Sequence, residues 1–405
     1  MRIIIHSDEY YPTAQACAFR MQVFADTFMA EGNQVTVITS SANKANSVKD
    51  SIPKQEKIIY SPAIRMKKKT TVMRMLNNLS FGFTSVFSSL RAGKADVVIT
   101  TSPPPLISIS GWIIARLKRA KLVYDVRDIW PDVALEMGSF SEKSVFCKVF
   151  ARITRFMYKH ADIITTVSPG KVDKIKSYVT SYSGKKAGPN HVEKVWLVGN
   201  GFDENITKSK FDKSIVEKYE LEEKFSCVYI GNIGLAQGLG SLLEVAANTK
   251  HRDIQFLCFG MGAEKELLEN RAKEEGLSNV HFCGVVDHDK VYSLLSRAKL
   301  SFIPLKSSNM KDSVPTKVYE ALGMGCPILL VAEGDSVDIL KEARLGLSLS
   351  PDKKEQLVTV FDEMIDHYED YSSNREFAIQ LMHEKYSRQK IAQDLNRRLH
   401  DLCEV

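Results

Sequence analysis

The chain has 405 residues, of which 44% are hydrophobic and 26% are charged, and its formal net charge is +6. This balance excludes an intrinsically disordered chain, and the length predicts two or three domains of ordinary size. Seven scattered cysteines without a C-x-x-C pair argue against a disulfide framework or a zinc site and for the reducing cytoplasm. No run of about twenty apolar residues occurs and only three isoleucines follow Arg2, so we expect neither a membrane-spanning helix nor a signal peptide.

In the first half of the chain, apolar runs alternate with amphipathic stretches. The expected strands cover residues 2–6, 34–39, 96–101, 121–126, 162–167 and 194–198. The expected helices cover residues 16–31, 72–92, 107–119, 143–160 and 169–179. Alternation of this kind predicts a parallel sheet covered by helices on both faces.

The second half repeats the alternation. The expected strands cover residues 225–230, 254–259, 279–284, 299–304 and 327–331. The expected helices cover residues 240–249, 263–275, 288–297, 316–324 and 353–367. Between the halves, residues 181–205 are rich in Gly, Pro and Asn, which indicates a hinge. We therefore expect two Rossmann-like domains that meet at a cleft and bind ligands at the carboxyl ends of their strands.

Two segments of the second half have the features of phosphate-binding loops. Glycines, which let a backbone turn tightly and approach an anion, follow the expected strand 225–230 at Gly231, Gly234 and Gly238. Residues 312–320 (DSVPTKVYE) open a helix between two apolar runs, with Lys317 in its first turn beside free N–H groups. Lys317 suits a diphosphate, and Glu320 suits the hydroxyls of a ribose. An ordinary amphipathic helix is the alternative, and the spacings match neither a dinucleotide fingerprint nor a Walker P-loop.

Charge is distributed unevenly between the halves. Residues 1–200 hold 29 Lys and Arg against 15 Asp and Glu, whereas the remainder holds 26 against 34, which indicates that the first half faces an anionic surface or substrate. In residues 65–90, basic side chains adjoin aromatic and aliphatic ones, which favours a segment lying on anionic lipid. For the similar residues 143–160, a helix with its apolar face in the core is the commoner explanation. No recognised nucleic-acid motif is present, so nucleic acid is not an expected partner.

Several segments together resemble one family, the retaining glycosyltransferases of family 4, which have the GT-B fold. In the second half these segments are GNIGLAQGL (231–239), FGMG (259–262), VHFCGVV (280–286) and VPTKVYE (314–320). In the first half they are VYDVRDIWP (123–131) and ADIITTVS (161–168). The VRDIWP and VPTK segments are most similar to the branch that builds O-antigens and capsules, including fucosamine-type sugar transferases.

The resemblance implies an α/β protein with the GT-B fold, in which two Rossmann-like parallel-sheet domains face each other across a cleft. Residues 1–200 would form the acceptor-side domain and residues 201–370 the nucleotide-sugar-binding domain. Residues 371–405 would be helices that cross back to the first domain.

The resemblance also implies which residues bind the donor. The two loops would hold the diphosphate and ribose, and the end of the strand at 284–286 would hold a uracil through main-chain groups. The implied donor-binding residues are Gly231, Asn232, Gly234, Gln237, Gly238, Val285, Val286, Pro315, Thr316, Lys317 and Glu320. Asn232 and Gln237 stand where the family usually carries an Arg and a Lys, so the phosphate charge would rest on Lys317, backbone amides and Arg127.

Three further residues are implied to be catalytic. Arg127 stands where the family commonly has a His near the donor sugar, and Asp128 would contact the sugar or the acceptor hydroxyl. An ion pair at a strand end is the alternative for these two. Asp312 stands for the first of two family acids, the second being Glu320, and would lie near the donor sugar. For the acceptor, Tyr11 and Arg20 are candidates; alternatively, Tyr11 plugs its loop and Arg20 lies on a solvated helix face.

The segment Asp287-His288-Asp289 matches the metal signature of a different glycosyltransferase fold, but it precedes a helix, where Asp is a natural N-cap. We therefore expect no metal ion and no cofactor, with a UDP-sugar as donor substrate. The expected activity is retaining, metal-independent transfer of an N-acetylated hexose or deoxyhexose to a polyprenyl-diphosphate-linked saccharide. The enzyme would be cytoplasmic and peripherally bound to the inner face of the cytoplasmic membrane. The alternatives are a UDP-sugar epimerase of the same fold and a non-catalytic nucleotide-sugar-binding protein.

Overall fold

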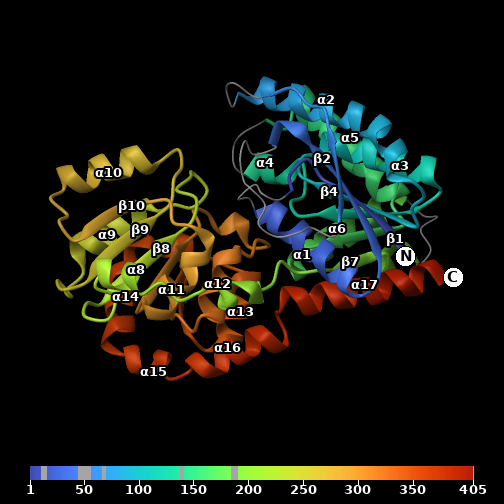
Figure 1. The fold of residues 1–405 in the computed structure, drawn as a ribbon. Helices are drawn as coiled ribbons and strands as arrows, with labels where there is room; N and C mark the ends of the chain where they lie inside the picture. The colour runs from blue at the N-terminus through green and yellow to red at the C-terminus, as the bar shows by residue number, and fades with distance from the viewer. Residues whose placement is uncertain (11–15, 44–55, 66–69, 137–140, 184–189, 405) are drawn as a thin grey trace. The chain divides into compact units, whose positions relative to one another are not determined.

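The computed structural model describes residues 1–10, 16–43, 56–65, 70–136, 141–183 and 190–404. The chain divides into two units, each built around one parallel sheet (Figure 1). Unit 1 comprises Met1–Asn200 and Gln389–Val405, and unit 2 comprises Gly201–Arg388. The expectation of two Rossmann-like α/β sheets is thereby confirmed. Tyr11, a candidate for acceptor binding, lies outside the described residues.

The sheet of unit 1 has seven parallel strands in the order β3-β2-β1-β4-β5-β6-β7. The strands are β1 (Arg2–His6), β2 (Gln34–Ser40), β3 (Lys57–Ser61), β4 (Val97–Ser102), β5 (Lys121–Val126), β6 (Ile163–Thr166) and β7 (Val195–Leu197). The helices are α1 (Ala16–Ala30), α2 (Thr71–Ser88), α3 (Ser108–Lys118), α4 (Asp132–Glu136), α5 (Val145–His160), α6 (Pro169–Ser183), α7 (Asn190–Glu193) and α17 (Arg388–Glu404).

Both faces of this sheet are covered by helices. Successive side chains of a strand point to opposite faces, so one strand contributes to two separate core clusters. Ile3 and Ile5 of β1 belong to a core cluster that includes residues of α1 and α17. Ile4 belongs to a second cluster, formed with residues of α3, α5 and α6. The central strands β1, β4, β5 and β6 are therefore buried on both sides, which explains why they read as continuous apolar runs in the sequence.

The sheet of unit 2 has six parallel strands in the order β10-β9-β8-β11-β12-β13. The strands are β8 (Ser226–Ile230), β9 (Gln255–Phe259), β10 (Val280–Gly284), β11 (Leu300–Pro304), β12 (Ile328–Val331) and β13 (Gly346–Leu349). The helices are α8 (Lys213–Lys218), α9 (Gly240–Asn248), α10 (Lys265–Glu274), α11 (Val291–Arg297), α12 (Thr316–Gly323), α13 (Asp335–Ala343), α14 (Leu357–Asp366), α15 (Tyr368–Ser372) and α16 (Arg375–Glu384).

The structure departs from the expected elements at the sheet edges and near the C-terminus. The edge strands β3 and β13 were not predicted, whereas the edge strands β7 and β10 were. The helices that cross back to unit 1 were expected from residue 371, but only residues 389–405 join unit 1. Ala378 and Met382 of α16 are buried in the core of unit 2, whereas Leu395 and Leu399 of α17 are buried in that of unit 1.

The outer helices of unit 1 differ in how they use their apolar residues. Helix α5 buries Phe150 and Met157, as the commoner explanation for residues 143–160 expects, although Val145, Phe146 and Val149 near its start are exposed. Helix α2 instead leaves large apolar side chains exposed, among them Phe83 and Phe87. Within the described part of the chain, no helix combines the length and the apolar character needed to cross a membrane.

Candidate functional site

The loops that follow β8, β9 and β10 lie at the carboxyl edge of the second sheet and are joined by backbone hydrogen bonds. Gly231 N donates to Phe259 O at 2.9 Å, and Gly260 N donates to Gly284 O at 2.7 Å. These bonds hold the three loops as one layer, at the edge where parallel sheets bind their ligands.

Two glycines make this close packing possible. At Gly260, where φ is +148°, an added Cβ would lie 1.8 Å from the carbonyl oxygen of Gly231. At Gly231, where φ is +146°, an added Cβ would lie 3.1 Å from Nζ of Lys317. Gly260 is therefore required by the packing of one loop on the next, and Gly231 leaves room for the lysine.

Lys317 stands in the first turn of α12, directly after the N-cap residue Pro315 and Thr316. Its Nζ donates to Tyr229 Oη at 2.9 Å and to Gln237 Oε1 at 2.9 Å. Tyr229 Oη in turn donates to the carbonyl oxygen of Asn232. The structure thus brings Lys317 together with Gly231, Asn232 and Gln237, although these residues lie more than seventy positions apart from it in the chain.

The lysine is poorly solvated in its surroundings. Burial lowers the pKa of Lys317 to about 7, and the nearby carboxylate of Glu320 offsets only part of this effect. Nζ also lies 4.1 Å from the centroid of the Tyr229 ring, whose π-face attracts a cation. Its hydrogen-bond partners are a phenol and an amide, and within the residues that the structure describes no acid forms a direct ion pair with it.

The remaining predicted donor residues occupy the neighbouring turns. An added Cβ on Gly238, where φ is +65°, would lie 3.1 Å from Cα of Lys306, and Lys306 N donates to Ala236 O at 3.1 Å. Gly234 follows in the same loop, where an added Cβ would lie 2.6 Å from Nδ2 of Asn232. Asp312 is partly buried in the segment before α12. The roles assigned to these side chains stay predictions.

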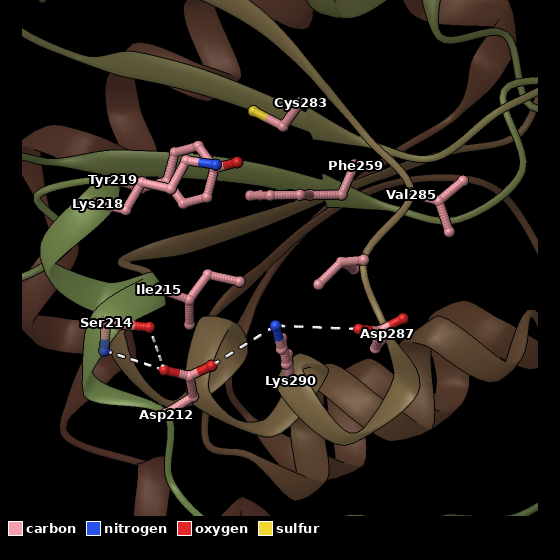
Figure 2. A pocket seen from close by; sticks show the side chains of 11 residues that line it. Asp212, Ser214, Ile215, Lys218, Tyr219, Phe259, Cys283, Val285, Asp287 and Lys290 are labelled. Atoms are coloured by element: carbon pink, nitrogen blue, oxygen red, sulfur yellow. Dashed lines mark hydrogen bonds and ion pairs between the residues drawn. The ribbon is translucent and has the colours of Figure 1, made fainter.

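A pocket of about 210 Å³ opens beside the end of β10, at Val285 and Val286 (Figure 2). Its walls include Tyr219 and Phe259, whose rings meet edge to face with centroids 5.1 Å apart. Ile215 contributes an aliphatic side chain from α8. The pocket therefore offers an apolar and aromatic surface next to the two residues predicted to hold a base.

Charged side chains border the same pocket. Lys290 Nζ lies 3.8 Å from a carboxylate oxygen of Asp212 and 3.9 Å from one of Asp287, as the dashed lines in Figure 2 mark. Asp212 also caps α8 by accepting a hydrogen bond from Ser214 N at 3.0 Å. The sequence reasoning missed the α8 residues, because they precede β8 and belong to no loop motif.

In unit 1, Arg127 follows β5 and is held by β4 and its loop. Its Nε donates to Thr101 Oγ1 at 3.1 Å, and Nη2 donates to Pro103 O at 2.7 Å. Burial opposes its charge, but Cys17 and Asp128, together with other acids, outweigh burial and raise the pKa of Arg127. The guanidinium is thus fixed in place and charged at the carboxyl edge of the first sheet.

Asp8, which the sequence reasoning did not select, is nearly buried in the loop after β1. Burial and the neighbouring charge of Glu9 raise the pKa of the Asp8 carboxyl to about 7, although Arg127 acts in the opposite direction. Its position directly after an apolar strand is the signal that could have identified it, because the carboxyl ends of parallel strands share one edge.

Arg20, a candidate for acceptor binding, is buried in unit 1 and does not lie on a solvated helix face. Its Nη2 lies 3.0 Å from Oδ1 of Asp125, with both side chains almost completely buried. The guanidinium also donates to the carbonyl oxygens of Val198 and Gly199 at 2.8 and 2.7 Å. Arg20 therefore ties α1 to β5 and to the segment after β7.

Asp287 occupies the N-cap position of the 3-10 turn His288–Lys290, but its side chain makes no capping hydrogen bond. The expected helix 288–297 is thus a short 3-10 turn followed by α11. Within the described ranges, no three His, Cys, Asp or Glu side chains converge as a metal site would require.

Comparisons with known proteins identify the family. The model of the glycosyl transferase 4-like domain matches residues 18–180, and that of the glycosyl transferases group 1 matches residues 211–380. The chain belongs to the glycosyltransferases with the GT-B fold, so the predicted fold and enzyme class are confirmed.

Individual relatives agree with this assignment. WcaI of Escherichia coli (strain K12), named as a colanic acid biosynthesis glycosyl transferase, is 23% identical over 353 residues, which cover 82% of this chain and 84% of WcaI. Sucrose-phosphate synthase from Thermosynechococcus elongatus has a TM-score of 0.80 at 15% identity, covering 99% of this chain and 98% of that one. HepE of Anabaena, solved with UDP and glucose, has a TM-score of 0.72 at 14% identity, covering 99% and 100%.

Proposed function

We propose that this glycosyltransferase moves a sugar from a UDP-sugar to a lipid-linked saccharide during the synthesis of a surface polysaccharide. The name of WcaI, which refers to colanic acid biosynthesis, supports the polysaccharide pathway. The complex of HepE with UDP and glucose supports the donor class. The acceptor we propose is a polyprenyl-diphosphate-linked saccharide at the inner face of the cytoplasmic membrane, and the sugar is an N-acetylated hexose or deoxyhexose.

The position of Lys317 carries the proposal. A diphosphate next to the Gly231 loop would meet the ammonium group of Lys317, free amides and the positive end of the dipole of α12. Such groups stabilise the negative charge that develops on a leaving diphosphate. Lys317 now bonds to a phenol and an amide, which a diphosphate can replace with a full negative charge.

The pocket at Val285 and Val286 suits the base of the donor. A uracil needs main-chain donors and acceptors at its edge and an apolar surface for its ring. The end of β10 would supply the main-chain groups, and Ile215, Tyr219 and Phe259 would supply the apolar surface. Glu320, one turn after Lys317 in α12, would then accept hydrogen bonds from the ribose.

For the reaction, we propose retention of the anomeric configuration without a metal ion. The acceptor hydroxyl oxygen forms a bond to the anomeric carbon on the face from which the diphosphate departs, the bond from that carbon to the phosphate oxygen breaks, and the hydroxyl proton passes to the leaving phosphate. Asp128, Arg127 and Asp312 are assigned to the sugar and the acceptor hydroxyl. NMR of the product tests this step, since an inverted anomeric centre would contradict it.

Ligand-dependent stabilisation tests the donor class. The unfolding temperature would be measured with UDP, GDP, ADP and their sugars, for the parent chain and for Lys317→Ala. A ligand at a hundredfold excess over its dissociation constant stabilises the folded state by about 2.7 kcal/mol. We expect stabilisation by UDP that the variant loses; stabilisation by GDP or ADP alone, or by no nucleotide, would contradict the proposal. Conversion of a UDP-sugar without acceptor would favour an epimerase.

A further inference from the structure

Helix α2 carries a row of exposed apolar side chains, which continues into the 3-10 turn Ser89–Ala92. The row consists of Val72, Leu76, Leu79, Phe83, Phe87 and Leu90, and it is called the α2 stripe here. Steps of three or four residues place all six on one side of the helix. Phe83 and Phe87 are 69% and 58% exposed, and their rings pack against each other with centroids 5.1 Å apart.

The opposite side of α2, which faces unit 1, is held mainly by polar contacts. Ser85 Oγ lies 3.0 Å from Nε2 of His6, a fully buried residue of β1. Asn77 Nδ2 donates to Ile64 O at 2.6 Å, and Ser88 Oγ lies 3.0 Å from Ser61 Oγ. The apolar exceptions are Phe81, which is stacked on the His6 ring, and Val86, which packs against the core cluster that contains Ile4.

This arrangement reverses the usual amphipathic helix, whose apolar face lies in the core. Because the inner side of α2 is fixed by these hydrogen bonds, a rotation that buried the stripe would break them. Monomeric soluble proteins rarely expose a contiguous apolar patch of this length without a binding function. The stripe therefore needs a partner outside unit 1.

The charge around the stripe identifies the chemistry of that partner. In the sequence, residues 57–95 contain eight Lys and Arg and no Asp or Glu, although Lys67, Lys68 and Lys69 lie outside the described residues. Arg74, Arg91 and Lys94 are exposed beside the stripe. A second copy of the chain would bring two such cationic surfaces together, whereas an anionic surface would pair with them.

We propose that the α2 stripe is a membrane-docking surface, on which α2 lies parallel to an anionic lipid bilayer with its apolar side chains among the acyl chains. Basic residues beside an interfacial apolar face add electrostatic attraction to anionic lipids. This docking rests on the proposed function, because a lipid-linked acceptor is presented at such a membrane surface.

Vesicle sedimentation tests the docking. The full chain would be mixed with vesicles of phosphatidylcholine alone or with phosphatidylglycerol at a molar ratio of about 2 to 1, at low and high salt. The test variant is Phe83→Asp/Phe87→Asp. The matched control is Leu267→Asp/Phe377→Asp, which changes two exposed apolar residues of unit 2. Thermal unfolding and UDP-dependent stabilisation show whether each variant is folded.

We expect the parent to sediment with the anionic vesicles only, and less at high salt. The test variant should lower the partition coefficient roughly 100-fold, because two partly inserted phenyl rings are replaced by anions, whereas the control should leave it unchanged. A Phe83→Trp variant should show a blue shift of its fluorescence with the anionic vesicles.

Three outcomes would overturn the proposal: no sedimentation of a folded parent, equal sedimentation of the test variant, or a parent dimer that the test variant dissociates. Vesicle binding requires neither donor nor acceptor. A failure of the docking with intact UDP-dependent transfer is therefore distinguishable from a failure of the proposed function.

Discussion

Replacing Lys317 by methionine should weaken UDP binding while leaving the fold intact. Methionine keeps the length and apolar stem of the side chain but removes the ammonium group that donates to Tyr229 and Gln237. The free protein loses two hydrogen bonds, and a typical hydrogen bond contributes about 1 kcal/mol net to the free energy of unfolding. The removal of a poorly solvated charge offsets part of that loss.

The size of the binding effect follows from the pKa of the lysine. Burial lowers this pKa from 10.5 to about 7 in the free protein. A bound diphosphate favours the charged form and raises the pKa again. One pKa unit corresponds to about 1.4 kcal/mol. If bound UDP raises the pKa of Lys317 by two or three units, the protonated lysine binds UDP more favourably than the neutral one by about 3–4 kcal/mol. The variant should therefore lose UDP affinity by roughly 100- to 1000-fold near pH 6.

The same linkage sets a pH dependence. The free protein loses the proton of Lys317 as the pH rises through about 7, whereas the UDP complex keeps it, so UDP affinity should fall by up to about tenfold per pH unit from pH 7 toward 9. In the absence of UDP, the unfolded chain binds the proton more tightly between pH 7 and 10.5. Lys317 therefore adds stability as the pH rises through that window, and this contribution is lost as the pH falls to 7.

Calorimetric titration of UDP at several pH values would measure both effects, with thermal unfolding of the free proteins beside it. The parent should take up protons on binding above pH 7, and Lys317→Met should show neither this uptake nor the slope. Equal UDP affinity of the two proteins near pH 6, or a parallel loss of stability in the variant, would refute the reasoning.

Three further changes test the scaffold by thermal or denaturant unfolding. Gly260→Ala should lower the free energy of unfolding by more than about 3 kcal/mol, because of the clash with Gly231 O and the positive φ. The control Gly276→Ala, at φ +66° with nothing within 4 Å, should lower it by about 1 kcal/mol. Equal losses would contradict the loop packing. Arg20→Met should cost about 3–5 kcal/mol by stranding the Asp125 carboxylate, and Arg20→Met/Asp125→Asn should recover part of it; no recovery would contradict this assignment. Burial lowers the pKa of His6 to about 3, so its contribution to stability is complete above pH 6.5 and is lost toward pH 3. His6→Gln should reduce the slope of the free energy of unfolding against pH in this window by up to about 1.4 kcal/mol per pH unit. An unchanged slope would contradict this prediction.

The sequence predicted the central strands and most helices, because their periodicity is local. Strand β1, for example, is a run of isoleucines between Arg2 and His6, and the structure has it with these bounds. The edge strands β3 and β13 lack such a signal. For α5 the sequence favoured an apolar face in the core, as the structure has it, but the surface on which the helix packs is formed by distant segments.

The candidate site was predictable where glycines and a helix start mark it. The loop at Gly231 and the first turn at Lys317 were selected separately, and the structure places them together. The partnership of Arg20 with Asp125, 105 positions apart, could not be derived from either segment. The α8 wall of the pocket was missed for the same reason, since residues such as Ile215 acquire their position only through the fold.

A transfer assay tests the central claim most directly. The full chain would be incubated with lipid-linked saccharides extracted from membranes and with a panel of radiolabelled UDP-, GDP- and ADP-sugars, and the organic phase would be counted. The account predicts that one UDP-sugar labels the lipid phase, with release of UDP, and that Lys317→Met abolishes this labelling. Label that enters the lipid phase only from a GDP- or ADP-sugar, or that stays in the aqueous phase with every donor, would contradict it.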